Sequence, residues 1–133
     1  MKLEHIGIAI KNLEESKALF SELFDTQPYK DEGVESEGVL TTFFKTGESK
    51  IELLSATNEE SPIAKFIEKK GEGIHHLAFE VEDIEHEIKR LSGLGYRVIN
   101  ETPKPGADNK KIAFLHPKST NGVLIELCQD IKK

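Results

Sequence analysis

The stretch that decides the fold reads GIHHLAFEVEDI over residues 73–84. Its alternating apolar residues predict a β-strand, and Asp83 ahead of an apolar stripe with helical spacing predicts a capped helix. Because side chains along a strand alternate between the two faces, the adjacent His75 and His76 must point in opposite directions. Large apolar residues share the face of His75, whereas small and polar residues share the face of His76. We therefore expect a structural role for His75 and open, partly polar surroundings for His76.

The same pattern occurs near the N-terminus, where residues 4–12 read EHIGIAIKN. A shift of 71 residues places His5 on His76, and a shift of 74 places Glu52 on Glu126. The three extra residues fall in the loop 116–122, which precedes the last predicted strand. A fixed period indicates a duplicated unit, here one that opens with a histidine and closes with a glutamate.

The repeat predicts how the chain is organised. With 133 residues we expect a single domain, made of a first module at 1–56, a linker helix at 57–72 and a second module at 73–133. Each module is predicted to be β-α-β-β-β, which defines an α+β fold whose sheets, covered by a helix on one face, curl together into a cleft. We expect residues 25–38 and 103–109 to be irregular and the last strand to begin at residue 122, because glycine and proline punctuate these segments.

The composition excludes several classes of protein. A net charge of -6 argues against nucleic acid as a partner. No apolar run is long enough to span a membrane, and the N-terminal residues do not resemble a signal peptide. A single cysteine, Cys128, rules out an internal disulfide framework and fits a reducing compartment. We expect a cytoplasmic protein without a membrane partner.

The repeated histidines and glutamates form a candidate metal site made of His5, Glu52, His76 and Glu126. Imidazole and carboxylate ligands suit a divalent ion such as Co, Ni, Zn, Mn or Mg, and the sequence does not choose among them. The absence of cysteine from the set argues against a structural zinc site. Each residue alone is more simply explained as a hydrogen-bonded strand histidine or a solvated glutamate, but their repetition in the same register favours ligands.

The loop 116–122 is a candidate binding element for an anionic group. It reads HPKSTNG, and its backbone amides, hydroxyls and ammonium group could hold a carboxylate or phosphate. We expect His116, Lys118 and Ser119 to contact the substrate, and the lysines around 65–70 and 104–111 could attract further negative charge. The alternative is a long hairpin loop with a solvated lysine.

Three stretches also carry a family resemblance: SPIAKFI at 61–67, GIHHLAFEV at 73–81 and KIAFLHPKSTNGVLIEL at 111–127. They resemble the methylmalonyl-CoA epimerases of the glyoxalase, or vicinal oxygen chelate, superfamily. The resemblance implies metal ligands at His5, His76 and Glu126, with Gln or Glu at the position of Glu52, and it implies a homodimer.

The activity implied by this resemblance is the metal-dependent abstraction of a proton next to a carbonyl. Methylmalonyl-CoA would be epimerised through a metal-stabilised enolate, with Glu126 or Glu52 as the base. Some epimerases carry a further acidic residue at the position of Thr41, which this chain lacks. Alternatives are glyoxalase I (lactoylglutathione lyase) acting on a glutathione hemithioacetal, a non-catalytic small-molecule-binding protein, and an iron dioxygenase, for which a fourth ligand would crowd the open positions.

Overall fold

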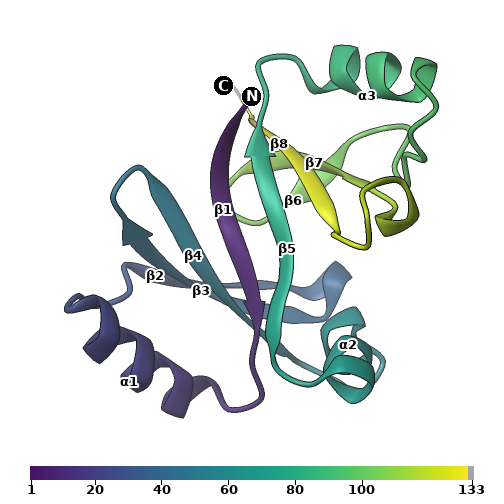
Figure 1. Cartoon of the computed structure of the whole chain (residues 1–133). Coiled ribbons are helices and arrows are strands. Elements are labelled where there is room, and N and C mark those ends of the chain that lie inside the picture. Colours follow the sequence, from purple (N-terminus) through teal and green to yellow (C-terminus); the bar gives the residue numbers. More distant parts are fainter. Residues whose placement is uncertain (132–133) are drawn as a thin grey trace. The chain divides into compact units, whose positions relative to one another are not determined.

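A computed structural model describes residues 1–131, and its elements run in the order β-α-β-β-β twice, with a helix between the two sets (Figure 1). The elements of the first set and the connecting helix are β1 Lys2–Ala9, α1 Leu13–Phe24, β2 Lys30–Val34, η1 Glu35–Glu37, β3 Val39–Thr46, β4 Ser49–Ala56 and α2 Pro62–Lys70. Those of the second set are β5 Gly73–Glu80, α3 Ile84–Gly93, β6 Lys104–Gly106, β7 Lys110–Leu115, η2 Pro117–Ser119 and β8 Ile125–Asp130. The expected α+β class with two tandem β-α-β-β-β units is confirmed.

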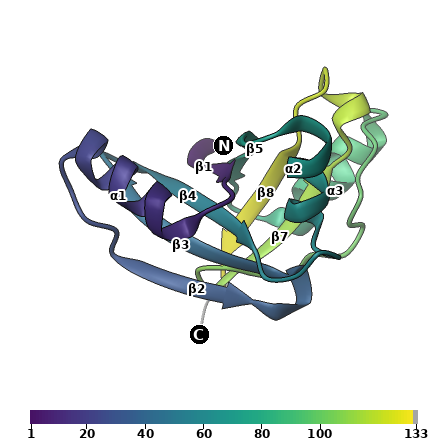
Figure 2. The same ribbon diagram turned by 90° about the horizontal axis from the view of Figure 1, so that it is seen from below.

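The chain forms two compact units, the first of which comprises residues 5–75. Its strands are ordered β2-β3-β4-β1, with β1 parallel to β4 and the other pairs antiparallel. Helix α1 runs alongside β4 (Figure 2), where Phe20 and Phe24 pack against Leu53 and Phe44. Asn12 caps this helix as predicted, because its side chain accepts a hydrogen bond from the backbone N–H of Glu15 at 3.0 Å.

Helix α2 belongs to the same unit and packs on the side of β4 that carries Leu54. Ile63 of the helix lies in one apolar cluster with Leu54 and Ala9. Ser61 caps the helix and Pro62 occupies its first turn, as the sequence indicates. The ring of His75 meets that of Phe66 edge-on at 4.9 Å between centroids, so the structural role expected for His75 agrees with its position.

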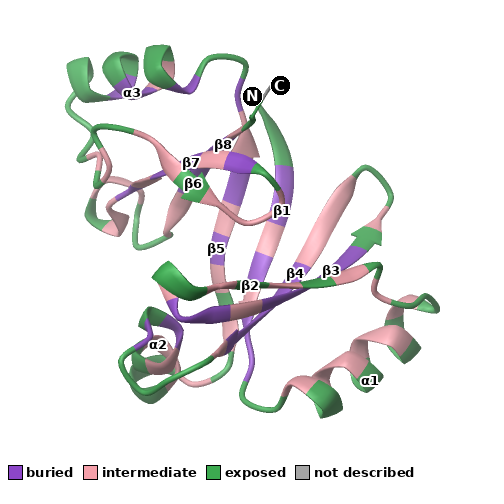
Figure 3. Cartoon of the chain, turned by 180° about the vertical axis from the view of Figure 1, so that it is seen from behind, coloured by how far each residue is buried: buried purple, intermediate pink, exposed green. Residues whose placement is uncertain are grey.

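The second unit comprises residues 1–4 and the chain from residue 76 onward. Its strands are ordered β5-β8-β7-β6, and β5 and β8 are parallel. Asp83 caps α3, whose buried face packs on the sheet through Ile84, Ile88 and Leu91. In Figure 3, α3 carries buried residues whereas α1 shows only intermediate and exposed ones. The apolar stripe read from the sequence therefore becomes the core of this unit.

The two segments expected to be irregular each contain a strand, so those expectations are wrong. β2 is built from the polar sequence KDEGV and pairs along its length with the buried strand β3. β6 has three residues, one of them a proline, which is tolerated because the strand lies at the sheet edge. Its Gly106 lies so close to Ile112 that an added Cβ would come within 2.8 Å of that side chain. The last strand begins at Ile125 rather than at residue 122.

No helix within residues 1–131 combines the length and the apolar character needed to cross a bilayer.

Candidate active site

In the N-terminal unit, strand pairing brings His5 and Glu52 together. Gly7 of β1 lies directly opposite Glu52 of β4, and His5 lies two residues before Gly7 on the same face. Because Gly7 has no side chain, the His5 imidazole can approach the Glu52 carboxylate. His5 Nδ1 lies 3.0 Å from Glu52 Oε2, and the two residues are only 4% and 5% exposed.

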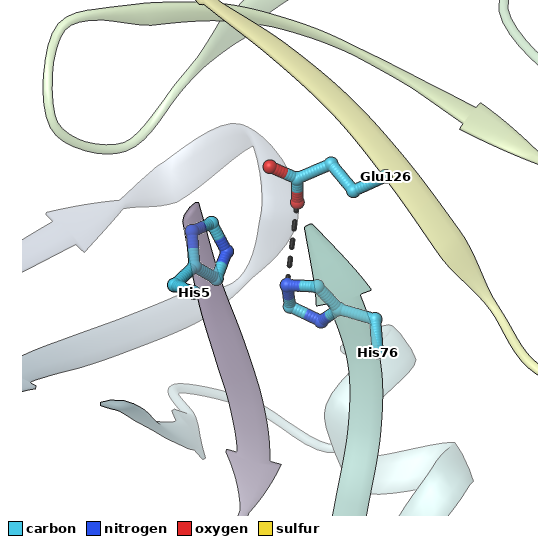
Figure 4. Close-up of side chains that lie close together, drawn as sticks. All are labelled: His5, His76 and Glu126. Atoms are coloured by element: carbon cyan, nitrogen blue, oxygen red, sulfur yellow. Dashed lines mark ion pairs between the residues drawn. The ribbon is translucent and has the colours of Figure 1, made fainter. Parts of the chain in front are cut away.

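In the C-terminal unit, the same local geometry brings His76 and Glu126 together. Ala78 of β5 pairs with Glu126 of β8, and His76 again lies two residues earlier on the same face. His76 Nε2 lies 3.3 Å from Glu126 Oε1, with both residues 5% exposed. Figure 4 shows this imidazole directed at the carboxylate, and it also shows His5 projecting from β1.

A phenylalanine flanks each glutamate on the neighbouring antiparallel strand of the sheet. Phe43 pairs with Glu52 across β3 and β4, and Phe114 pairs with Glu126 across β7 and β8. The rings of His76 and Phe114 meet edge-on at 6.1 Å between centroids. In both units, therefore, the glutamate pairs with a small residue on one neighbouring strand and with a phenylalanine on the other.

The chemistry of these two pairs fits a divalent cation. A carboxylate removed from water is unfavourable unless a positive group or hydrogen-bond donors compensate its charge. Each buried glutamate has an imidazole nitrogen within ion-pair distance, and a cation between nitrogen and oxygen ligands would serve the same purpose. The chain thus contains histidine and glutamate groups that could hold a divalent metal.

The single cysteine, Cys128, lies near the pair of His76 and Glu126, but its thiol is not reactive. Cys128 is fully buried, and its thiol donates to the backbone carbonyl of Phe79 at 3.5 Å. Burial, followed by the negative charges of Glu126 and Glu4, raises the pKa of this thiol far above its ordinary value. The thiol therefore stays protonated at physiological pH, in agreement with a nitrogen and oxygen ligand set.

The predicted substrate loop forms a 3-10 turn in which two of the three candidate residues are already engaged. His116 Nδ1 accepts the backbone N–H of Lys118 at 3.0 Å, and Ser119 Oγ accepts the backbone N–H of Arg97 at 2.7 Å. Loss of hydration and the positive charges of Arg97 and Lys118 lower the pKa of His116. Lys118 itself is exposed. The structure thus brings His116, Lys118 and Ser119 together in one turn.

Lys110, one of the lysines expected to attract an anionic ligand, is instead buried and lies near two carboxylates, the buried Glu4 and the exposed Asp130. It is 5% exposed, its Nζ donates to Asp130 at 2.5 Å, and the same atom lies 4.0 Å from Glu4. The expectation for this lysine is wrong. Two adjacent lysines give no sequence signal that would tell the buried Lys110 from the more exposed Lys111.

The fold agrees with comparisons to known proteins. The chain belongs to the Glyoxalase/Bleomycin resistance protein/Dioxygenase superfamily, whose family model matches residues 4–114. Over 127 residues it is 44% identical to the mitochondrial methylmalonyl-CoA epimerase of Dictyostelium discoideum, covering 95% of this chain and 76% of the relative. It is 41% identical over 130 residues to the ethylmalonyl-CoA/methylmalonyl-CoA epimerase of Cereibacter sphaeroides, covering 96% and 97%.

The chain is also similar in structure to a solved methylmalonyl-CoA epimerase. A single-residue variant of the Streptomyces coelicolor methylmalonyl-CoA epimerase, in complex with 2-nitronate-propionyl-CoA, superposes with a TM-score of 0.93 at 32% identity, covering 98% of this chain and 94% of that one.

Proposed function

We propose that this chain is an enzyme that interconverts the two epimers of methylmalonyl-CoA by removing and returning the proton at C2. The observation that carries the proposal is the buried histidine–glutamate pair, which occurs at the same register in both units. The activity of relatives at 41–44% identity supports the substrate, and the acyl-CoA analogue bound to the Streptomyces enzyme supports the ligand class.

His5, Glu52, His76 and Glu126 are proposed to hold one divalent ion together. Two imidazole nitrogens and two carboxylates would suit Co, Ni, Zn, Mn or Mg as the bound ion. When bound, such an ion supplies positive charge that stabilises the negative oxygen of an enolate, worth several kcal/mol. The two imidazoles are held by their strands on the same face as the glutamates, which pre-arranges the ligand atoms within each unit.

Glu126 is proposed to take the proton from C2, with Glu52 as the alternative base. A carboxylate beside the α-carbon can accept the proton as the carbonyl gains negative charge, a contribution of typically 10²–10⁴-fold. Burial excludes water from both carboxylates and so protects the carbanionic intermediate from uncontrolled protonation. His116, Lys118 and Ser119 are proposed to bind the free carboxylate of the acyl group.

A second candidate function follows from the ligand set itself. Two histidines and two glutamates would equally suit glyoxalase I, a lactoylglutathione lyase, because a glutathione hemithioacetal poses the same problem of removing a proton next to a carbonyl. A non-catalytic binding protein is disfavoured, since simple binding of a small molecule does not require four buried side chains that are suited to hold a metal.

One experiment separates these functions. The purified protein is given single epimers of methylmalonyl-CoA and, in parallel, methylglyoxal with glutathione. We expect epimer interconversion, and we expect Glu126→Gln to lower its rate by at least about 100-fold because the base is lost. Turnover of the hemithioacetal without any interconversion would reassign the chain to glyoxalase I.

We further propose that residues 1–133 act as one domain, that the protein is cytoplasmic and that it forms a homodimer. The edge strands of an open sheet expose unpaired backbone groups, and they are aggregation risks unless they are covered or paired. Light scattering at micromolar concentration tests the dimer, and a monomer mass would contradict it.

A further inference from the structure

The turn proposed to bind the acyl carboxylate is more elaborate than the hairpin that contains it requires. In the first unit, β3 and β4 are joined by residues 47–48 alone, whereas in the second unit residues 116–124 separate β7 from β8. Because the two hairpins occupy the same place in their units, the short connection shows that the scaffold does not need the long one. The residues that shape the longer connection are therefore candidates for a role in the reaction.

His116 shapes this connection through one atom of its imidazole. Its Nδ1 accepts the backbone N–H of Lys118 at 3.0 Å, so the side chain caps the turn 117–119. The backbone of His116 adds two bonds, because its N–H donates to the carbonyl of Arg97 at 2.8 Å and its carbonyl accepts the N–H of Ser119 at 2.9 Å. His116 is thus bonded directly to Lys118 and Ser119, the two other residues proposed to hold the carboxylate.

The bond to Lys118 decides which form of the imidazole is present. A ring nitrogen that accepts a hydrogen bond carries no proton, so a neutral His116 must have its proton on Nε2. A protonated ring would instead point an Nδ1–H at the N–H of Lys118, and the bond would be lost. Loss of hydration and the positive charges of Arg97 and Lys118 hold the pKa of His116 below its ordinary value of 6.5. The turn is therefore built for a neutral ring.

The hydroxyl of Ser119 is oriented in a similar way. Its oxygen accepts the backbone N–H of Arg97 at 2.7 Å, which leaves the hydroxyl proton to point elsewhere. The hydroxyl of Ser119 and the ammonium of Lys118 are thus two donors on one turn, and an ionised carboxylate offers only acceptors. Both donors belong to a turn whose conformation the Nδ1 bond of His116 stabilises.

We propose that His116 is a positioning residue, which serves the reaction by holding Lys118 and Ser119 in place through Nδ1. This inference rests on the proposed epimerisation, and it narrows the part of His116 in the carboxylate site from a contact to a support. Without the bond to Nδ1 the turn would sample other conformations, and the two donors would have to be ordered when the substrate binds. The loss should therefore appear in the KM for methylmalonyl-CoA more than in kcat.

The test separates the two nitrogens of the ring. His116→Asn places an amide oxygen where Nδ1 lies and keeps the cap, whereas His116→Gln places its amide group near Nε2 and loses the cap. We expect His116→Asn to keep a KM close to that of the wild type, and His116→Gln and His116→Ala to raise the KM roughly tenfold. The control is His86→Gln, an exposed histidine on α3, which should match the wild type. Circular dichroism shows whether each variant is folded.

The pH dependence of the KM provides a second readout, which a merely structural role would not change. The wild-type KM is expected to rise as the pH falls well below 6.5, because protonation of His116 breaks its bond to Lys118. An asparagine does not titrate, so the KM of His116→Asn should stay level over the same range.

Two results would overturn the assignment while epimerisation remains. One is a KM that rises in His116→Asn but not in His116→Gln, which would mean a direct contact through Nε2, and the other is an equal KM in these two variants. Independently of turnover, the nitrogen NMR spectrum of the wild-type ring should show the Nε2–H tautomer, and an Nδ1–H tautomer would overturn the assignment. Absence of epimerisation in the wild-type protein would instead overturn the proposed function and, with it, this role of His116.

Discussion

His75 and His76 are neighbours in sequence but have different surroundings, because a strand directs them to opposite faces. His75 lies against the ring of Phe66, and burial, assisted by the charge of Lys70, lowers its pKa to about 4. His76 lies 3.3 Å from Glu126 in a buried pair. At the scale of single residues, strand parity therefore separates a packing histidine from a candidate ligand.

The lowered pKa of His75 predicts that stability falls in mild acid. The unfolded chain binds a proton at His75 near pH 6.5, whereas the folded protein resists protonation until about pH 4. The contribution of the neutral His75 ring to the free energy of unfolding is therefore complete above pH 6.5, and it is lost as the pH falls toward 4. A shift of this size corresponds to at most about 3 kcal/mol. Urea unfolding at pH 7.5 and pH 4.5 should show a smaller difference in His75→Phe than in the wild type. An unchanged difference would contradict this account.

Lys118 provides a second prediction at the residue scale. If its ammonium binds the free carboxylate of the substrate, Lys118→Ala should weaken apparent binding by roughly ten- to a hundredfold, since a charge-assisted hydrogen bond is worth roughly 1.5–3 kcal/mol. The exposed Lys89 of α3 provides a matched control. The measurement is the KM for methylmalonyl-CoA. Equal catalytic efficiency in Lys118→Ala and the wild type would mean that this side chain is only solvated.

At the scale of elements, the helix starts follow from their caps. Asn12 and Asp83 stand in extended conformation before α1 and α3, and each side chain accepts a backbone N–H of the first turn. The helix α1 has no fully buried residue, so its cap should matter more than it would on a helix anchored in a core.

Asn12→Ala is therefore predicted to lower the free energy of unfolding by about 1 kcal/mol, whereas Asn12→Ser should be close to neutral because it keeps a capping oxygen. Chemical denaturation of the two variants provides the comparison. Equal stability of the alanine and serine variants would show that α1 is held by its packing alone.

The strands show which parts of the fold could be predicted from the sequence. β1, β3, β4, β5 and β7 carry strong apolar or alternating patterns, and the sequence predicts their positions closely. β2 and β6 could not be predicted from the sequence, because their residues are polar or include glycine and proline. Their strand conformation depends on pairing with β3 and β7, a tertiary contact without a local signal.

At the scale of the whole molecule, the repeat accounts for most of what the sequence reveals about the site. The two shifts of 71 and 74 residues predict one histidine and one glutamate in each unit, and the strand register brings each pair to within 3.3 Å. The burial of Lys110 could not be predicted in this way. Its burial depends on ion pairs with Glu4 and Asp130, which are far from it in the sequence or carry no local signal.

The measurement that tests the central claim most directly is a metal titration of proton exchange at C2. The protein is stripped of metal with a chelator, titrated with Co²⁺ and incubated with methylmalonyl-CoA in D2O, while bound cobalt is counted by elemental analysis. We predict that deuterium uptake at C2 rises with added metal and levels off at one ion per chain. The outcome that would contradict the account is equally fast exchange in the metal-free protein, or no exchange at any metal concentration.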